Sequence, residues 1–368
     1  MMRRTFLQSA AGTGLALAQA DQESGAPAVP IRLGFDSYSV RSFGWEAMQL
    51  LDYAAGLKLD GIQISSLGDF ASLEPAYLRR VKDRAAELGI KIDGGIDSIC
   101  QSSQGFHAKN GSPSEFLLRG LRAAQAVGAS SVRCYLGARA DRGGPRPIEA
   151  LMEEVIANFR SVRSQALDLG VKIAIENHSG DLEAEQVKTI IEEAGRDYVG
   201  SCLDTGNPMW LLEDPLYTLE VLGPYVVTTH VRDSAVWEQP RGAAFQWVAL
   251  GDGNIDFHKF VARYREVCPH ATMQLEIITG RPPAYLNYLE PDFWKVLPKT
   301  RAEKFARFLA IARSGHPFNG FMVVADGLKN PPPEYSAALK EQQRVDLERS
   351  LEYAKKKLNV GVNWRPNA

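Results

Sequence analysis

The stretch "KIAIENHSGD", residues 172–181, begins as a short apolar run and then ends abruptly in Glu176, Asn177 and His178. An apolar run of this length, bounded by polar residues and Gly, is typical of a strand in a protein core. Such a strand carries a carboxylate, an amide and an imidazole to one edge of the core. The strands predicted beside it decide whether these groups have partners.

Seven further runs, rich in apolar and β-branched residues, resemble this one. The eight predicted strands are 31–37, 60–66, 91–98, 130–136, 171–177, 199–205, 225–231 and 272–277. Segments with apolar residues three and four positions apart alternate with the strands. They predict amphipathic helices, for example at 45–57, 77–89, 113–128 and 148–170. Several of these segments end in Gly, the usual helix stop before a strand.

Eight strands that alternate with helices, at roughly 31 residues per unit, predict an α/β fold of the (β/α)₈ TIM-barrel type. An open doubly wound sheet is the alternative, but no G-x-G-x-x-G follows the first predicted strand, so its nucleotide-binding version loses its main support. Long loops at 233–256 and 279–298 follow the seventh and eighth strands, on the face where barrels build active sites. We expect substrate walls or lids there, with neutral insertions or oligomer contacts as the alternative. A strongly helical tail at 334–358 predicts a C-terminal extension that packs on the barrel or on a partner subunit.

The composition is that of a folded globular protein, with 45% hydrophobic and 23% charged residues and a formal charge of −2 over 368 residues. The basic residues are dispersed, so we expect no nucleic-acid partner. The four cysteines have no close pairs and lie in or beside apolar runs, which favours buried thiols over a disulfide framework.

The first twenty residues resemble a twin-arginine export signal. Arg3 and Arg4 precede a modestly apolar stretch that ends in a small-x-small cleavage site at 18–20. This predicts an exported, periplasmic protein without a membrane anchor in its mature form; an N-terminus that merely contains two arginines is the alternative. The predicted organisation is a signal at 1–20, an arm at 21–30, a barrel at 31–330 and a helical extension at 331–368.

Four predicted strands end in ionisable side chains. These are Glu176 on the fifth strand, Asp204 on the sixth, His230 on the seventh and Glu276 on the eighth. In a closed barrel consecutive strand ends lie along one arc of the same rim. Three carboxylates and an imidazole form a mostly oxygen site for one divalent cation, with Mn²⁺ expected first and Mg²⁺, Co²⁺ and Zn²⁺ as alternatives. Each residue alone also has a simple structural explanation, but buried carboxylates without a cation or partner are costly.

The blocks "IAIENHSGD", "SCLDTGNP", "HVRD", "LGDGNIDF" and "QLEI" resemble the signature of the xylose isomerase-like TIM-barrel superfamily, which includes sugar isomerases and epimerases. The resemblance covers 31–278 and is strongest to the ketose 3-epimerase branch. It implies that the four strand-end residues bind one Mn²⁺-like ion and that Glu176 and Glu276 also carry the proton. Where relatives often have D-x-x-H, this chain has Asn207 in place of the histidine, which argues against a multi-zinc endonuclease. Gln63 stands where many relatives have a glutamate.

Further side chains are predicted to bind the substrate. Residues two apart on a strand point to the same face, so His178 faces the same way as Glu176, and Arg232 the same way as His230. Support of the metal ligands is the alternative role for both. Asn207 is expected to hydrogen-bond a substrate hydroxyl. The remaining substrate-binding candidates are Arg133 on the fourth strand, His107 in the loop after the third, and Trp237, which like Trp210 and Trp247 suits either stacking on a sugar face or packing.

The predicted function is a metal-dependent carbohydrate isomerase or epimerase that removes a proton next to a carbonyl with a Glu/Glu acid-base pair. A lyase or hydrolase acting on 3-keto-glycosides would use the same proton abstraction. A sugar-binding barrel without catalysis is a third alternative, which the intact glutamate pair disfavours. The expected partner is a small-molecule carbohydrate, a free or oxidised sugar or a glycoside rather than a sugar phosphate if the protein is exported. A homo-oligomer is left open.

Overall fold

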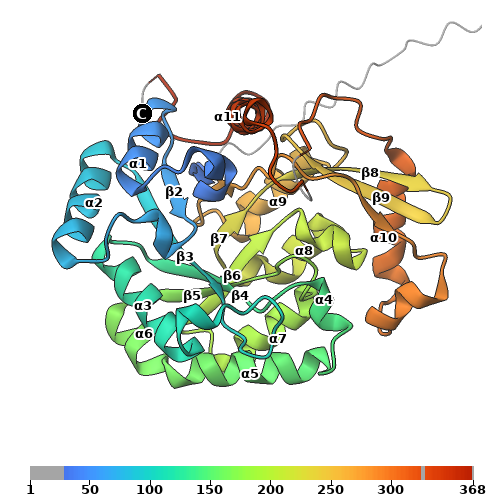
Figure 1. Cartoon of the computed structure of the whole chain (residues 1–368), viewed down its shortest axis with the longest axis horizontal. Helices are drawn as coiled ribbons and strands as arrows, with labels where there is room; N and C mark the ends of the chain where they lie inside the picture. The colour runs from blue at the N-terminus through green and yellow to red at the C-terminus, as the bar shows by residue number, and fades with distance from the viewer. Residues whose placement is uncertain (1–28, 325–327, 367–368) are drawn as a thin grey trace, which may run out of the picture.

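The structure, a computed structural model, describes residues 29–324 and 328–366. The predicted export signal and most of the arm lie outside the described residues. Eight parallel strands form one sheet in the order β10-β1-β2-β3-β4-β5-β6-β7, with helices around it (Figure 1). Its strands are β1 (Leu33–Asp36), β2 (Gly61–Ile64), β3 (Lys91–Ser98), β4 (Ser131–Tyr135), β5 (Lys172–Glu176), β6 (Val199–Asp204), β7 (Val226–His230) and β10 (Met273–Leu275). Each lies inside one of the predicted ranges.

The sheet closes on itself between β7 and β10. The amide of Val231 donates to the carbonyl of Gln274 at 2.8 Å, and the amide of Glu276 donates back to the carbonyl of Val231 at 3.0 Å. These bonds join the last strand of the series to the first, which removes the sheet's open edges. The predicted TIM barrel is therefore confirmed, and the open doubly wound sheet is wrong.

The helices follow the predicted apolar periodicity. They are α1 (Ala47–Gly56), α2 (Pro75–Leu88), α3 (Pro113–Ala126), α4 (Arg139–Arg142), α5 (Ile148–Ser161), α6 (Arg163–Leu169), α7 (Ala184–Ala194), α8 (Pro215–Leu222), α9 (Phe257–Val267), α10 (Ala302–Ser314) and α11 (Pro333–Lys356). The segment predicted as one helix at 148–170 breaks at Val162, whose φ of −114° ends α5. No helix within the described ranges has both the length and the apolar character needed to cross a bilayer.

The two long loops fold together into a small antiparallel sheet beside the barrel. The hairpin of β8 (Asp233–Gln239) and β9 (Gly242–Val248) pairs with β11 (Ala284–Leu286). Figure 1 shows β8 and β9 on the right of the molecule with α10 next to them. Val236, Phe245 and Leu286 share a second apolar cluster with Phe308 of α10. The sheet thus has its own core, separate from the main cluster of the barrel.

The C-terminal helix α11 packs on the barrel. Leu347 and Leu351 are buried in the main apolar cluster. The Asp346 carboxylate accepts a hydrogen bond from Thr279 Oγ1 at 2.9 Å, and Ser350 Oγ accepts from the Leu250 amide at 2.9 Å. Of the two alternatives for the predicted tail, packing on the barrel is confirmed. The prediction of buried thiols is confirmed as well, because all four cysteines are buried and unbridged.

Candidate metal centre

Four ionisable side chains meet at the carboxyl-terminal rim of the barrel. Glu176, Asp204 and His230 are the last residues of β5, β6 and β7, and Glu276 directly follows β10. One ligand atom from each lies within 4.8 Å of the others, and all four residues are buried. The four predicted ligands therefore converge as expected from parallel strand ends. That they hold a cation stays a prediction.

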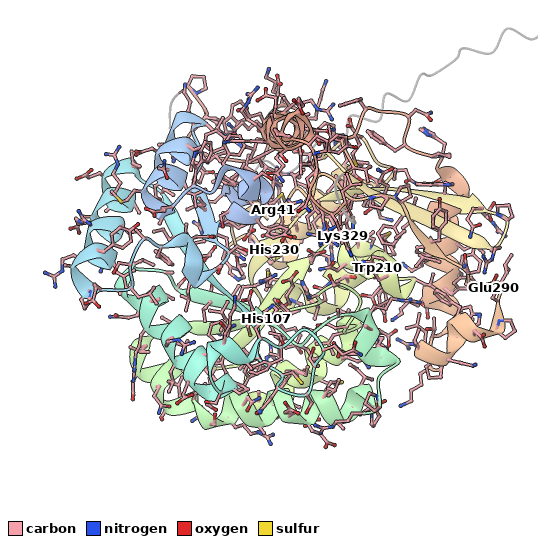
Figure 2. All side chains as sticks on the ribbon, viewed as in Figure 1. Arg41, His107, Trp210, His230, Glu290 and Lys329 are labelled. Atoms are coloured by element: carbon pink, nitrogen blue, oxygen red, sulfur yellow. The ribbon has the colours of Figure 1, made fainter. Side chains whose placement is uncertain are left out.

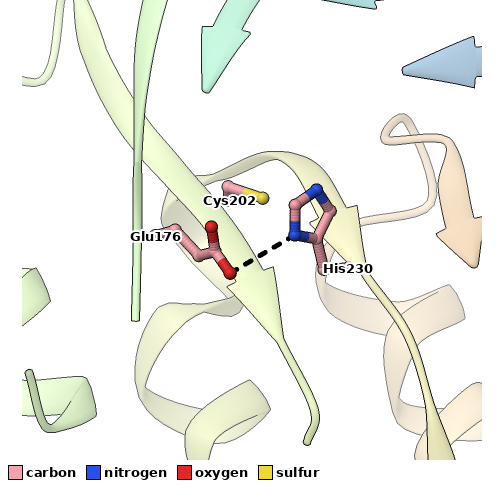
Figure 3. A group of neighbouring side chains, drawn as sticks. All are labelled: Glu176, Cys202 and His230. Carbon is pink, nitrogen blue, oxygen red and sulfur yellow. Dashed lines mark hydrogen bonds and ion pairs between the residues drawn. The ribbon is translucent and has the colours of Figure 1, made fainter. Parts of the chain in front are cut away.

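The carboxylate of Glu176 is held on both sides. Figure 3 shows it facing His230, with Cys202 beside them. Glu176 Oε1 lies 3.3 Å from His230 Nδ1, and Oε2 accepts from Arg133 Nε at 2.5 Å. Burial alone would raise the pKa of Glu176, but the Arg133 guanidinium and His230 outweigh burial and hold this pKa well below its ordinary value. Glu176 is therefore ionised.

The carboxylate of Asp204 is positioned mainly by its neighbours on the chain. Its Oδ1 accepts from the amides of Gly206 at 2.7 Å and Asn207 at 2.6 Å. The side chain of Asn177 holds the Asp204 backbone, since its amide accepts from N–H and donates to C=O, each at 2.9 Å. Burial raises the pKa of Asp204 to about 6, although nearby Arg232 opposes this shift. These bonds explain why an asparagine follows Glu176.

The guanidinium of Arg232 lies between two of the carboxylates. Its Nη2 is 2.8 Å from Asp204 Oδ2, and its Nη1 pairs with the carboxylate of Glu276. The same Nη2 donates to Asn207 Oδ1 at 2.9 Å, and Asn207 Nδ2 donates to Glu176 Oε1 at 3.1 Å. Arg232 and Asn207 were predicted to bind substrate. In this structure both hold the predicted metal ligands, as Arg133 does.

His230 contacts carboxylates through both ring nitrogens. Its Nδ1 lies 3.3 Å from Glu176 and 3.5 Å from Glu276, and its Nε2 lies 3.4 Å from Asp36 Oδ2. Burial would lower the pKa of His230, but Glu176 and Asp36 outweigh it and raise this pKa to about 9. Asp36 was missed from the sequence. Its place as the last residue of β1, level with the other strand ends, was the available signal.

A chain of polar side chains inside the barrel sets the orientation of His230. Its Nε2 lies 2.5 Å from the side-chain amide of Gln63, which contacts Thr228 Oγ1 at 2.9 Å. Thr228 Oγ1 donates to Gln63 Oε1, so Gln63 Nε2 is the atom that faces His230 Nε2. The same hydroxyl lies 3.1 Å from Asp93 Oδ2. Nδ1 of His230 faces Glu176 and Glu276, so a cation bound there would take the place of its proton.

The residues fit a hard divalent cation. Asp204 Oδ2 is buried and forms an ion pair with Arg232. Among the described residues it has no hydrogen-bond partner. Four carboxylates, those of the cluster and of Asp36, face the two guanidiniums and His230, so the site keeps an excess of negative charge even with His230 protonated. Carboxylate oxygens with one imidazole are ligands that Mn²⁺, Mg²⁺ and Zn²⁺ all accept. The cation would share Asp204 and Glu276 with Arg232.

A cavity of about 410 Å³ opens beside these residues. Its lining includes the predicted residues Arg133, His178, Asn207, Arg232 and Glu276. Glu176 is fully buried and is absent from the described lining, so the two glutamates differ in their access to a ligand.

His178 forms part of the cavity wall as a neutral imidazole. Its ring stacks on Tyr135 with centroids 3.9 Å apart, and its Nδ1 donates to the carbonyl of Gly137 at 2.6 Å. Burial lowers the pKa of His178 to about 4. Because Nδ1 carries the proton, Nε2 keeps a lone pair that can accept a hydrogen bond from a hydroxyl.

Two predicted substrate residues lie away from this cavity. His107 is exposed at the start of a short 3₁₀ turn, and Figure 2 shows it apart from His230. Trp237 is partly buried on β8, and Trp247 lines the cavity instead. The reason is strand parity: Trp247 pairs with Ser234 and shares its face, whereas Trp237 is three residues from Ser234 and faces the other way.

Residues 51–285 match the family model described as xylose isomerase-like TIM barrel. A relative, 3-oxo-isoapionate decarboxylase of Pectobacterium atrosepticum, is 23% identical over 237 residues, which cover 61% of this chain and 78% of the relative. A crystal structure of D-psicose 3-epimerase has a TM-score of 0.55 at 16% identity, covering 89% of this chain and 99% of its own. A magnesium-bound barrel protein from Mycobacterium smegmatis has a TM-score of 0.52 at 16% identity, covering 76% and 96%. The chain belongs to the xylose isomerase-like TIM-barrel family.

Proposed function

We propose that this protein is a carbohydrate isomerase or epimerase that uses one divalent cation to move a proton at a carbon next to a carbonyl. The observation that carries the proposal is the convergence of four buried ligand atoms within 4.8 Å beside a polar cavity. The fold shared with proteins named as 3-epimerases, and with a magnesium-bound barrel, supports it. Mn²⁺ is the ion expected first, with Mg²⁺, Co²⁺ and Zn²⁺ as alternatives.

The cation would be held by Glu176, Asp204, His230 and Glu276 and would stabilise negative charge that develops on the substrate carbonyl oxygen. Glu276 borders the cavity, so it is the carboxylate placed to take the proton from carbon. To invert the carbon, Glu176 would have to exchange a proton on the opposite face of the substrate. His178 Nε2 would accept a hydrogen bond from a substrate hydroxyl, and Asn207 would do so only by giving up its bond to Glu176 or Arg232.

A second candidate function also places negative charge on a carbonyl oxygen but ends in the loss of a group from the substrate. The relative named as a 3-oxo-isoapionate decarboxylase suggests loss of CO₂ from a 3-oxo sugar acid, and a 3-keto-glycoside would instead lose its aglycone from the β carbon. Either reaction puts negative charge on the same oxygen and needs only one carboxylate in the cavity. The burial of Glu176 behind the lining favours this reading. A sugar-binding barrel without catalysis is the third candidate.

The proton step is tested by measuring metal content and deuterium exchange together. Purified protein, as wild type, Glu276→Gln and Glu238→Gln, is assayed for bound metal and incubated in D₂O with D-fructose, D-psicose and 3-keto-glucose. We expect about one divalent ion per chain and deuterium at carbon in the wild type, and a loss of exchange of at least about 100-fold in Glu276→Gln. Glu238 is exposed on β8, outside the described lining of the cavity, and serves as the matched control.

The products separate the candidates. An epimer or isomer of unchanged mass supports the first function, whereas CO₂ or a free aglycone, with 3-oxo acids or 3-keto-glycosides as probes, supports the second. A wild-type protein that binds no divalent ion after supplementation, catalyses no exchange and releases neither CO₂ nor an aglycone would sink both. Binding of sugars without any reaction would support the third candidate, a sugar-binding barrel without catalysis.

Export and the choice of partner are also proposals. We propose a periplasmic protein that acts on a small carbohydrate, without a nucleic-acid partner or a membrane anchor. This proposal rests on residues 1–20 and on the dispersed charge of the chain. The first residue of the protein recovered from its native host tests the export part, since cleavage after Ala20 would leave Asp21 at the N-terminus. An uncleaved chain would contradict it.

A further inference from the structure

A second cavity, of about 340 Å³, adjoins the candidate metal centre. It is lined by Trp210, Phe245 and Trp247 and by residues 281–284. Trp247 and Arg281 line both this cavity and the larger polar one. The two spaces are therefore neighbours that share a wall, and a ligand seated in the first can extend toward the second.

The aromatic walls of the second cavity are packed against one another. Trp210 meets Phe245 edge to face at 4.9 Å and 88°, and it meets Trp247 at 6.4 Å and 81°. Trp247 Nε1 donates to the carbonyl of Gly206 at 3.1 Å, which ties it to the loop that follows Asp204. In Figure 2, Trp210 lies on the side of His230 toward Glu290. Rings fixed in this way offer a preformed surface at little entropic cost.

The two cavities differ in chemistry. The larger one carries charged groups such as Arg133, Arg232 and Glu276, which suit the hydroxyls and carbonyl of a sugar. The described lining of the second one consists of aromatic rings, two prolines and an alanine, with Arg281 as its charged member at the shared wall. An apolar, ring-lined space binds a flat apolar group by burial and stacking.

The second cavity is built largely by the two long loops, which take no part in closing the barrel. Phe245 and Trp247 belong to β9, and residues 281–284 lead into β11, where Ala284 pairs with Phe245. Both long loops therefore contribute to one wall next to the metal centre. A monosaccharide held only in the polar cavity would leave this wall without a ligand to contact.

We propose that the second cavity is a subsite for an aromatic aglycone, so that the substrate is the keto form of an aryl glycoside rather than a free monosaccharide. The inference deepens the proposed function and rests on it for the seating of the sugar in the polar cavity. Trp247 and Arg281 border both spaces, so the bond that joins sugar and aglycone passes beside them.

Paired ligands test the subsite without turnover. Calorimetry on the full chain with Mn²⁺ present compares phenyl with methyl β-D-glucopyranoside, neither of which has the carbonyl that the reaction requires. We expect the phenyl compound to bind about tenfold or more tighter, as burial of a phenyl ring implies. Ala284→Trp, which fills the cavity, and Trp210→Ala, which removes one wall, should each bring the ratio of the two affinities close to one.

Tyr285→Trp is the matched control, because it adds the same side chain one position further along β11 at a residue that is 64% exposed and outside the described lining. It should keep the wild-type ratio. Three results would overturn the subsite. They are equal affinities for the phenyl and methyl ligands, no binding of either, and a ratio of the two affinities that stays at the wild-type value in both cavity variants. A high affinity ratio without deuterium exchange would support the subsite and contradict the proposed function. Deuterium exchange with an affinity ratio of one would support the proposed function and contradict the subsite.

Discussion

His230 shows how much of a candidate metal site depends on residues outside the four predicted ligands. Its Nδ1 faces Glu176 and Glu276, and its other nitrogen is held by Gln63 and Asp36. A histidine that binds a metal commonly donates its second N–H to a carboxylate or carbonyl, which fixes the tautomer and the plane of the ring. Asp36 is therefore a positioning residue for His230.

Asp36→Asn should weaken divalent metal binding by about 10- to 100-fold, because the amide keeps the shape of the side chain but loses the charge near His230 Nε2. The fold should persist, since Asn can still accept the bond that Asp36 Oδ1 receives from the Tyr38 amide at 2.9 Å. Titration calorimetry with Mn²⁺ measures the change, with Glu238→Gln as control. Wild-type affinity in Asp36→Asn would show that the carboxylate does not orient His230.

At the scale of elements, one buried lysine fastens α10 to the barrel. Lys304 Nζ donates to Glu213 Oε2 at 2.9 Å and also pairs with Glu183, at the start of α7. Burial would lower the pKa of Lys304, but these carboxylates outweigh it and raise this pKa above its ordinary range. Because α10 also packs on the small sheet, the two ion pairs of Lys304 link that sheet to the barrel rim.

Lys304→Met should lower the free energy of unfolding by about 3–5 kcal/mol, because it leaves Glu213 buried without its cation. The comparison is Lys299→Met, just before α10, which removes an ion pair between the exposed Lys299 and Glu149 and should change stability little. Guanidinium unfolding of both variants measures the difference. Equal stabilities would mean that the buried pair contributes no more than the exposed one.

At the scale of the molecule, the main core encloses Cys100, Cys134 and Cys268, and Cys202 is buried beside Glu176 and His230. Each thiol is buried, and burial raises the pKa of Cys100 and of Cys268 to about 12. A buried thiol that stays protonated reacts slowly with thiol reagents.

The native protein should therefore show almost no reaction with a disulfide reagent at pH 8, and all four thiols should react after unfolding in guanidinium without reductant. Two missing thiols in the unfolded protein would reveal a disulfide. Rapid labelling of the native protein would mean that the core opens on the timescale of the reaction.

The sequence alone determined the barrel and its four-residue centre. Apolar periodicity is local, so it marks strands such as 171–177 and their helices without knowledge of the fold. Once the strands are parallel, their carboxyl ends must share one rim, and Glu176, Asp204, His230 and Glu276 must converge. The same rule would have found Asp36, had the end of the first strand been compared with the others.

Only the tertiary structure decided which side chains surround that centre. The long loops after β7 and β10 carry no repeating pattern, and their antiparallel pairing joins segments that are distant in the chain. That register, rather than composition, turns Trp247 toward the cavity and Trp237 away. His107 shows the same limit, because a loop's position relative to a barrel depends on contacts that local sequence does not encode. The convergence of the four predicted ligands follows from the period of the backbone, whereas the walls of the cavity follow from long-range packing.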